Sequence, residues 1–131
     1  MKNILLILLS VLIGFSACKT KSFSKKQDKT IDLLYSMNFG GTEPFWAINF
    51  SKDKAIYSDY PGAEKITLSY EIKEINNENF IIDAYDKENS ESFFISIKKE
   101  DCTDGMSDNT YPYSIEIKRD TRTLYGCGWK R

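Results

Sequence analysis

The sequence contains no histidine among its 131 residues. This absence removes the commonest general base, the Ser-His and Cys-His nucleophile pairs, and the usual zinc and copper ligand sets. A phosphate-binding loop is also missing, because Phe39-Gly40-Gly41-Thr42 has neither the spacing nor the lysine of such motifs. We therefore expect a protein that is not an enzyme, with no cofactor and no metal.

Cysteine is scarce, and the first of its three residues, Cys18, lies near the N-terminus. An apolar run from Ile4 to Phe15 precedes it, which is shorter than the roughly 20 residues that span a bilayer. Residues 1–17 therefore predict a signal peptide. Their ending, Phe15-Ser16-Ala17-Cys18, resembles a bacterial lipobox, which implies a lipoprotein with palmitate or similar chains on Cys18 as its membrane anchor.

The other two cysteines, Cys102 and Cys127, predict a disulfide, because an exported chain folds in an oxidising compartment. A disulfide that closes a loop of about 26 residues lowers the conformational entropy of the unfolded chain, which stabilises a fold by roughly 3 to 4 kcal/mol. The pair therefore has a sufficient structural role without any redox chemistry.

Charge divides the chain into two parts. Residues 18–30 carry five Lys and one Asp with little apolar content, which predicts a flexible basic tether after the lipidated cysteine. Residues 31–131 carry 12 Lys and Arg against 18 Asp and Glu, a formal charge of about −6. An acidic domain argues against nucleic acid as a partner. Lys19 in place of an aspartate favours the periplasmic side of the outer membrane, if the cell is Gram-negative.

The body of the chain, residues 31–131, alternates apolar and polar residues with period two, which is typical of β-strands. Short polar segments that favour turns separate the alternating stretches. We expect one all-β domain, an antiparallel meander of seven or eight strands that forms a small barrel. The stretches that predict strands are 45–50, 55–57, 66–72, 80–85, 93–97, 113–117 and 124–129.

Asp101-Cys102-Thr103-Asp104-Gly105-Met106-Ser107-Asp108 concentrates oxygen and sulfur side chains. Its spacing does not follow the helix-loop-helix calcium pattern, which disfavours a calcium site without removing it. The favoured interpretation is an ordered loop in which Asp104 and Asp108 accept amides and Met106 packs inward. A catalytic carboxylate pair is the less favoured alternative, since it needs a cleft that holds two such groups.

The segment Gly41-Thr42-Glu43-Pro44-Phe45-Trp46 predicts the start of a strand, on which Phe45 and Trp46 face opposite sides. Two interpretations stay open. In the first, Trp46 packs in the core and Glu43 accepts hydrogen bonds from loop amides. In the second, Glu43 and Trp46 form a mouth of the barrel that receives a ligand group. A buried Glu43 would need a partner such as Arg119.

Four motifs occur in order: GTEPFW at 41–46, CTDGMSD at 102–108, Tyr111-Pro112-Tyr113 and Gly126-Cys127. Together they resemble a family of uncharacterised bacterial envelope lipoproteins, some of them joined to META/HslJ-type domains. The resemblance implies a β-rich lipoprotein but transfers no activity. Small lipoprotein barrels that inhibit lysozyme are similar in architecture alone.

The sequence thus predicts a lipid-anchored cell-envelope β-barrel, a non-catalytic module that binds an unknown envelope ligand or protein partner. The alternative is an inhibitor of a cationic envelope-directed enzyme such as lysozyme. The residues expected to form the binding rim are Glu43, Trp46, Asp104, Met106, Ser107, Asp108 and Tyr111.

Overall fold

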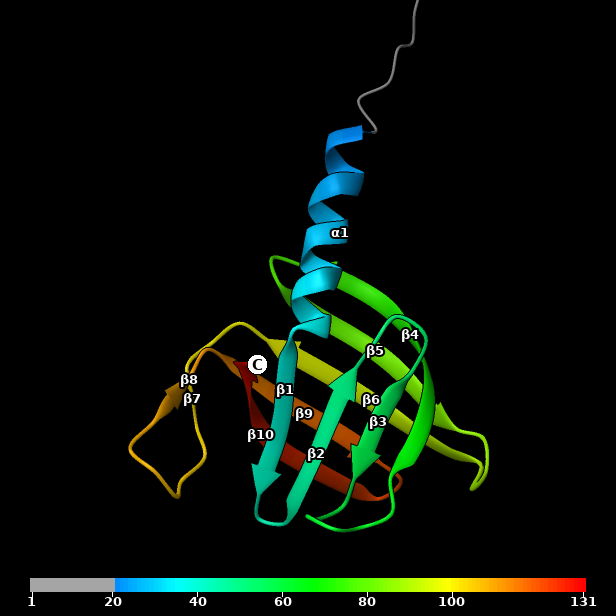
Figure 1. Ribbon diagram of the computed structural model, residues 1–131, viewed down its shortest axis with the longest axis vertical. Coiled ribbons are helices and arrows are strands. Elements are labelled where there is room, and N and C mark those ends of the chain that lie inside the picture. Colours follow the sequence, from blue (N-terminus) through cyan, green and yellow to red (C-terminus); the bar gives the residue numbers. More distant parts are fainter. Residues whose placement is uncertain (1–20) are drawn as a thin grey trace, which may run out of the picture.

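The computed structural model describes residues 21–131, which form one helix and a β-barrel (Figure 1). The predicted signal peptide and the lipid attachment at Cys18 lie outside the described residues. Within the described part, no helix is long and apolar enough to cross a bilayer. The elements are α1 (Lys21–Tyr35), β1 (Met37–Thr42), β2 (Phe45–Phe50), β3 (Ala55–Ser58), β4 (Ile66–Asn76), β5 (Asn79–Asp86), β6 (Glu91–Lys98), β7 (Cys102–Thr103), β8 (Thr110–Tyr111), β9 (Tyr113–Arg119) and β10 (Arg122–Lys130).

Eight strands close into a barrel in the order β1-β10-β9-β6-β5-β4-β3-β2, and all neighbours are antiparallel. Each strand pairs with the next along the chain, and β1 closes the ring by pairing with β10. The connection from β6 to β9 is the exception, because it contains a small separate sheet of β7 and β8. The predicted all-β antiparallel barrel with one disulfide is confirmed.

Alternation along the strands fills the barrel interior with apolar side chains. On β9, for example, Tyr113, Ile115 and Ile117 are buried while the residues between them are more exposed. Aromatic rings pack across the interior: Trp46 stacks on Tyr57 with ring centroids 6.4 Å apart. In residues 66–72, 93–97 and 113–117, the apolar side of the period-two pattern is the side that faces inward.

β1 is the barrel strand that the period-two pattern did not predict. Its sequence, MNFGGT, has two glycines and an asparagine, which are uncommon in strands. The structure shows why glycine is needed: Gly41 pairs across the sheet with Trp46, and a Cβ on Gly41 would lie 2.2 Å from the indole Nε1. The two ends of the GTEPFW segment therefore contact each other inside the barrel.

Residues 21–35 form α1, which stands at one end of the barrel (Figure 1). The prediction of a flexible tether is therefore wrong for residues 21–30, which are helical. The helix can form because this stretch has no glycine or proline and is rich in residues that favour helices. The last turn is held by the barrel, since Leu34 is fully buried in the core. Ser36 ends the helix: its amide and hydroxyl donate to the carbonyl oxygen of Leu33, at 3.0 and 2.7 Å.

A buried arginine occupies the barrel end away from α1, where the turns β1–β2, β3–β4, β5–β6 and β9–β10 lie. Arg119 is 8% exposed and donates to Glu91 at 2.7 Å and to Asp59 at 2.9 Å. Its guanidinium also lies over the rings of Tyr57 and Phe93, at 5.2 and 5.0 Å. Burial raises the pKa of Tyr57 to about 12, and this phenol donates its proton in a hydrogen bond to Asp59.

Candidate functional site

The connection between β6 and β9, residues 99–112, forms a flap on the outside of the barrel. In Figure 1 it projects from the side of the barrel, next to β10. β7 and β8 pair with each other, and both contact β10. Since β6 and β9 pair directly along their length, the flap leaves the barrel and returns without interrupting the sheet.

Three contacts hold the flap against the barrel wall. The disulfide joins Cys102 on β7 to Cys127 on β10, which confirms the predicted pair. The Thr42 hydroxyl donates to the Asp104 carbonyl oxygen at 3.0 Å, and the Tyr111 ring packs on Trp129 with centroids 5.5 Å apart. The flap is therefore fixed to both β1 and β10.

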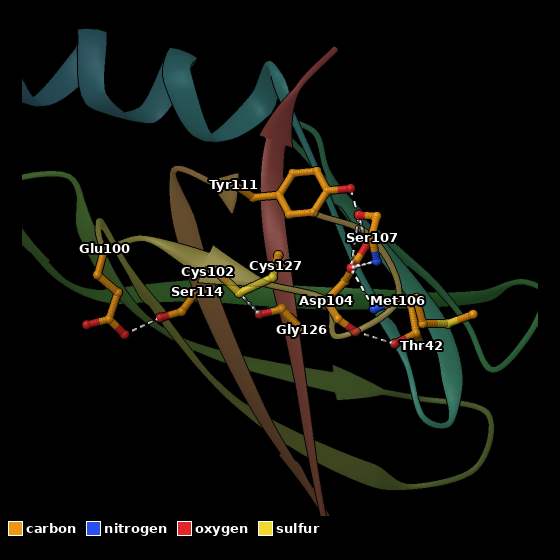
Figure 2. Close-up of a disulfide and its surroundings, with 10 residues drawn as sticks. All are labelled: Thr42, Glu100, Cys102, Asp104, Met106, Ser107, Tyr111, Ser114, Gly126 and Cys127. Carbon is orange, nitrogen blue, oxygen red and sulfur yellow. Dashed lines mark hydrogen bonds between the residues drawn. A yellow bond between two sulfur atoms is a disulfide. The ribbon is translucent and has the colours of Figure 1, made fainter. Parts of the chain in front are cut away.

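Asp104 orders the interior of the flap (Figure 2). Its Oδ1 accepts the amides of Met106 and Ser107, both at 3.0 Å, and its Oδ2 accepts the Tyr111 hydroxyl at 3.3 Å. These donors, the Met106 amide first, lower the pKa of the Asp104 carboxyl group below its ordinary value. Gly105 supplies the positive φ of 73° that the turn requires. The expected ordered loop with Asp104 as an amide acceptor is confirmed. Asp108 was expected to accept amides too, but among residues 21–131 its side chain accepts no hydrogen bond.

Two rows of outward-facing residues cross the barrel wall beside the flap. In one row, Ser96 on β6 pairs with Glu116 on β9, which pairs with Tyr125 on β10. In the other row, Lys98 pairs with Ser114, which pairs with Cys127, which pairs with Gly40 on β1. The disulfide rises from the second row. The first row therefore stays open to one side of the flap.

A groove of about 580 Å³ lies between the flap and these rows. The flap residues that line it run from Cys102 to Gly105, with Glu100 at the base, where Glu100 accepts the Ser114 hydroxyl. Four carboxylate residues and one lysine line the groove: Glu43, Glu100, Asp104, Glu116 and Lys98. The groove is therefore acidic, lined by hydroxyl groups, and bordered by the exposed ring of Tyr125.

The structure brings part of the predicted rim together. Glu43 and Asp104 both line the groove, and Tyr111 supports the flap through Asp104 and Trp129. Ser107 donates its hydroxyl to Asp104 as well, while Asp108 is exposed on the flap. Asp104, Ser107 and Tyr111 therefore act mainly by holding the loop in shape.

Trp46 is 4% exposed inside the barrel, which confirms the interpretation of Trp46 as a core residue and makes its place in the expected rim wrong. The inward packing expected for Met106 is also wrong. Met106 does not pack inward: it is 64% exposed at the turn of the flap, because the Asp104 hydrogen bonds fold the backbone and leave this side chain outside. Glu43 is exposed, and Arg119 pairs instead with Asp59 and Glu91.

Glu100, Glu116 and Tyr125 also line the groove, and the sequence patterns did not predict them as site residues. Each stands at a polar or exposed position, so single-strand alternation marks it only as outward-facing. Their proximity depends on the register of β6, β9 and β10 and on the position of the flap. The one signal in the sequence that could have indicated their proximity was their outward position on successive hairpins.

Among residues 21–131, the structure gathers no group of three or more His, Cys, Asp or Glu side chains that could hold a metal ion. The Asp104 carboxylate, the centre of the calcium alternative, is occupied by flap amides and hydroxyls. The carboxyl groups whose pKa departs clearly from the ordinary value, Glu78, Asp86 and Asp104, are all shifted downward.

Fold and site together define a closed eight-stranded antiparallel β-barrel with a disulfide-held flap over an acidic outer groove. No family model matches the chain, and no curated protein or solved structure matches it. The resemblance to uncharacterised envelope lipoproteins therefore stays a prediction.

Proposed function

We propose that the protein is a lipid-anchored, non-catalytic binding module of the cell envelope, and that its ligand or partner occupies the groove under the flap. The groove carries this proposal, because three separate contacts hold its flap wall in place. A pre-formed concave surface with a few polar groups is the usual form of a binding site. Asp104 serves this site by ordering the flap.

The groove can be closed without touching the core. Ser96 faces outward on β6 and lines the groove, whereas Ser92 faces outward on the same strand and lies outside it. Ser96→Trp fills the groove, and Ser92→Trp is the matched control. Amide chemical shifts of the full chain are followed while soluble peptidoglycan fragments, pooled pentapeptides and a c-type lysozyme are added in turn.

We expect one probe class to shift the amides of Gly40, Gly126 and the flap, and Ser96→Trp to abolish that response while Ser92→Trp retains it. Shifts scattered over the barrel, or equal responses from both variants, would contradict a groove function. Membrane attachment has its own test: Cys18→Ala should release the protein from membranes or leave an unprocessed precursor.

The acidic lining of the groove favours one second candidate, inhibition of a cationic envelope-directed enzyme such as lysozyme. Micromolar full-length protein is added to a lysozyme assay with and without Ser96→Trp. Unchanged lysozyme activity with the wild-type chain rules this candidate out.

A further inference from the structure

We infer that the groove binds an extended polypeptide segment and places one of its lysine or arginine side chains among the groove carboxylates. This inference rests on the proposed function and names its ligand class. Three separate properties of the groove support it: its negative charge, the edge of β7 that has no strand partner, and the backbone floor at Gly40 beside Tyr125.

The charge of the groove favours a cation. Glu43 makes no ion pair among residues 21–131, and Glu116 lies 3.5 Å from Lys118, a surface contact that water screens. The Asp104 carboxylate is used within the flap. Glu43, Glu100 and Glu116 therefore present negative charge to the groove against the single positive charge of Lys98. A guanidinium or ammonium group compensates this excess through charge-assisted hydrogen bonds.

The edge of β7 favours a polypeptide. β7 pairs with β8 along one side, and its residues Cys102 and Thr103 line the groove, whereas the β8 residues do not. In this two-stranded sheet β7 has no second neighbour, so a strand that lines the groove keeps one edge without strand pairing. An extended segment can add to such an edge through main-chain hydrogen bonds. The barrel strands offer no comparable edge, since each has two neighbours.

The floor of the groove lets a chain approach closely. Gly40 and Gly126 line it with backbone atoms: Gly40 faces outward without a side chain, whereas a Cβ on Gly126 would point inward, 2.7 Å from the Trp46 ring. Tyr125, 68% exposed, borders this bare stretch and offers an aromatic face to a cation or an apolar side chain. A neutral saccharide could also use this ring, but it would leave the carboxylates uncompensated and the β7 edge unpaired.

A pentapeptide library tests the inference with the full-length protein. Each immobilised pool is acetylated and amidated, has random flanking residues, and fixes the central position as Lys, Arg, norleucine or Glu. We expect the Lys and Arg pools to retain about tenfold more protein than the norleucine pool, as a charge-assisted contact predicts. N-methylation of the peptide backbone should remove this retention, because it blocks pairing with β7.

Variants assign the effect to the groove. Glu43→Gln with Glu116→Gln should bring the Lys pool down to the norleucine level. Glu74→Gln, an exposed carboxylate on β4 outside the groove, is the matched control and should change nothing.

Equal retention of the Lys and norleucine pools overturns the inference, as does retention that survives the double Gln substitution. Binding of chitotetraose, in place of the peptides, at the groove amides also overturns it, yet leaves the proposed function standing. If no peptide pool retains the protein, the inference is overturned too. The proposed function is overturned as well only if none of the probes in its own test gives different responses with Ser96→Trp and Ser92→Trp.

Discussion

Gly41→Ala is expected to destabilise the barrel because the new methyl group would collide with Trp46. The added Cβ would lie 2.2 Å from the indole Nε1, 2.8 Å from its Cε2 and 2.6 Å from the Tyr125 carbonyl oxygen. Ordinary contacts between such atoms are about 3.5 Å, so the ring and the strand must each move by about 1 Å. Overpacking of this kind costs about 1 to 3 kcal/mol.

Removal of a strand glycine has an opposing benefit, since Ala loses less backbone entropy on folding, by roughly 0.5 to 1 kcal/mol. Because the contacts are so short, we expect the cost of the clash to exceed this entropy benefit. We expect a net loss of about 2 kcal/mol for Gly41→Ala, measured by urea unfolding followed by far-ultraviolet circular dichroism.

A double-mutant cycle identifies the cause. Trp46→Leu removes the ring that Gly41→Ala would strike, so the double variant should be about 1 kcal/mol more stable than the two single effects predict. Rescue stays partial because the Tyr125 carbonyl oxygen remains close. Gly62→Ala is the control: no heavy atom lies within 4 Å of its added Cβ, so its cost comes from its φ of 87° and should add to that of Trp46→Leu. Additive effects of Gly41→Ala and Trp46→Leu would refute the contact as the reason for the glycine.

Replacing Cys102 and Cys127 together by Ala should lower the free energy of unfolding in urea by about 3 to 4 kcal/mol, since the disulfide joins residues 25 apart in sequence; a loss below about 1 kcal/mol would contradict this. Arg119→Ala should cost about 2 to 3 kcal/mol in thermal unfolding, because it removes the ion-pair partner of Glu91, one of the two donors to Asp59, and the packing on the Tyr57 and Phe93 rings; Arg119→Lys, which keeps the charge, should recover part of that loss, and identical values for the two variants would count against the ion pairs. The pKa of Asp104 is lowered in the folded flap, so its contribution to flap stability is present above the unfolded value of about 3.9 and is lost as the pH falls through the folded value. The Met106 amide shift should therefore titrate below that pH, and Asp104→Asn should remove the titration.

Most of the barrel could be predicted from sequence because its strands alternate strongly. β6 and β9 each carry an isoleucine-rich inward side between polar residues, so local pattern and final packing agree. β1 could not be recognised in the same way, since its glycines serve a tryptophan on another strand. Helix α1 was missed because its lysine-rich first turns look unable to pack, whereas its last turn packs on the barrel through Leu34.

The candidate site was predictable only in part. Asp104 and Gly105 carry turn chemistry that is visible locally, which is why an ordered loop was expected. The groove depends on strand register: Glu116 and Tyr125 become neighbours because β9 and β10 pair as they do. Trp46 was assigned to two possible places because a strand pattern says that a side chain points inward but not how far the barrel covers it.

The flap is the long loop that closes the hairpin of β6 and β9, since these strands pair from Phe93–Arg119 to Lys98–Ser114 and residues 99–112 join them. Loop length adds little to the cost of closing such a loop, about 0.6 kcal/mol for each doubling. The segment between Lys99 and Pro112 can therefore be exchanged for others while the wall beneath it persists. The groove is built from both parts, since Glu116 and Tyr125 lie on the barrel strands and Cys102 to Gly105 on the flap. A flap grafted with Cys102 and Cys127 retained as the fixed fastening would therefore face an unchanged barrel wall.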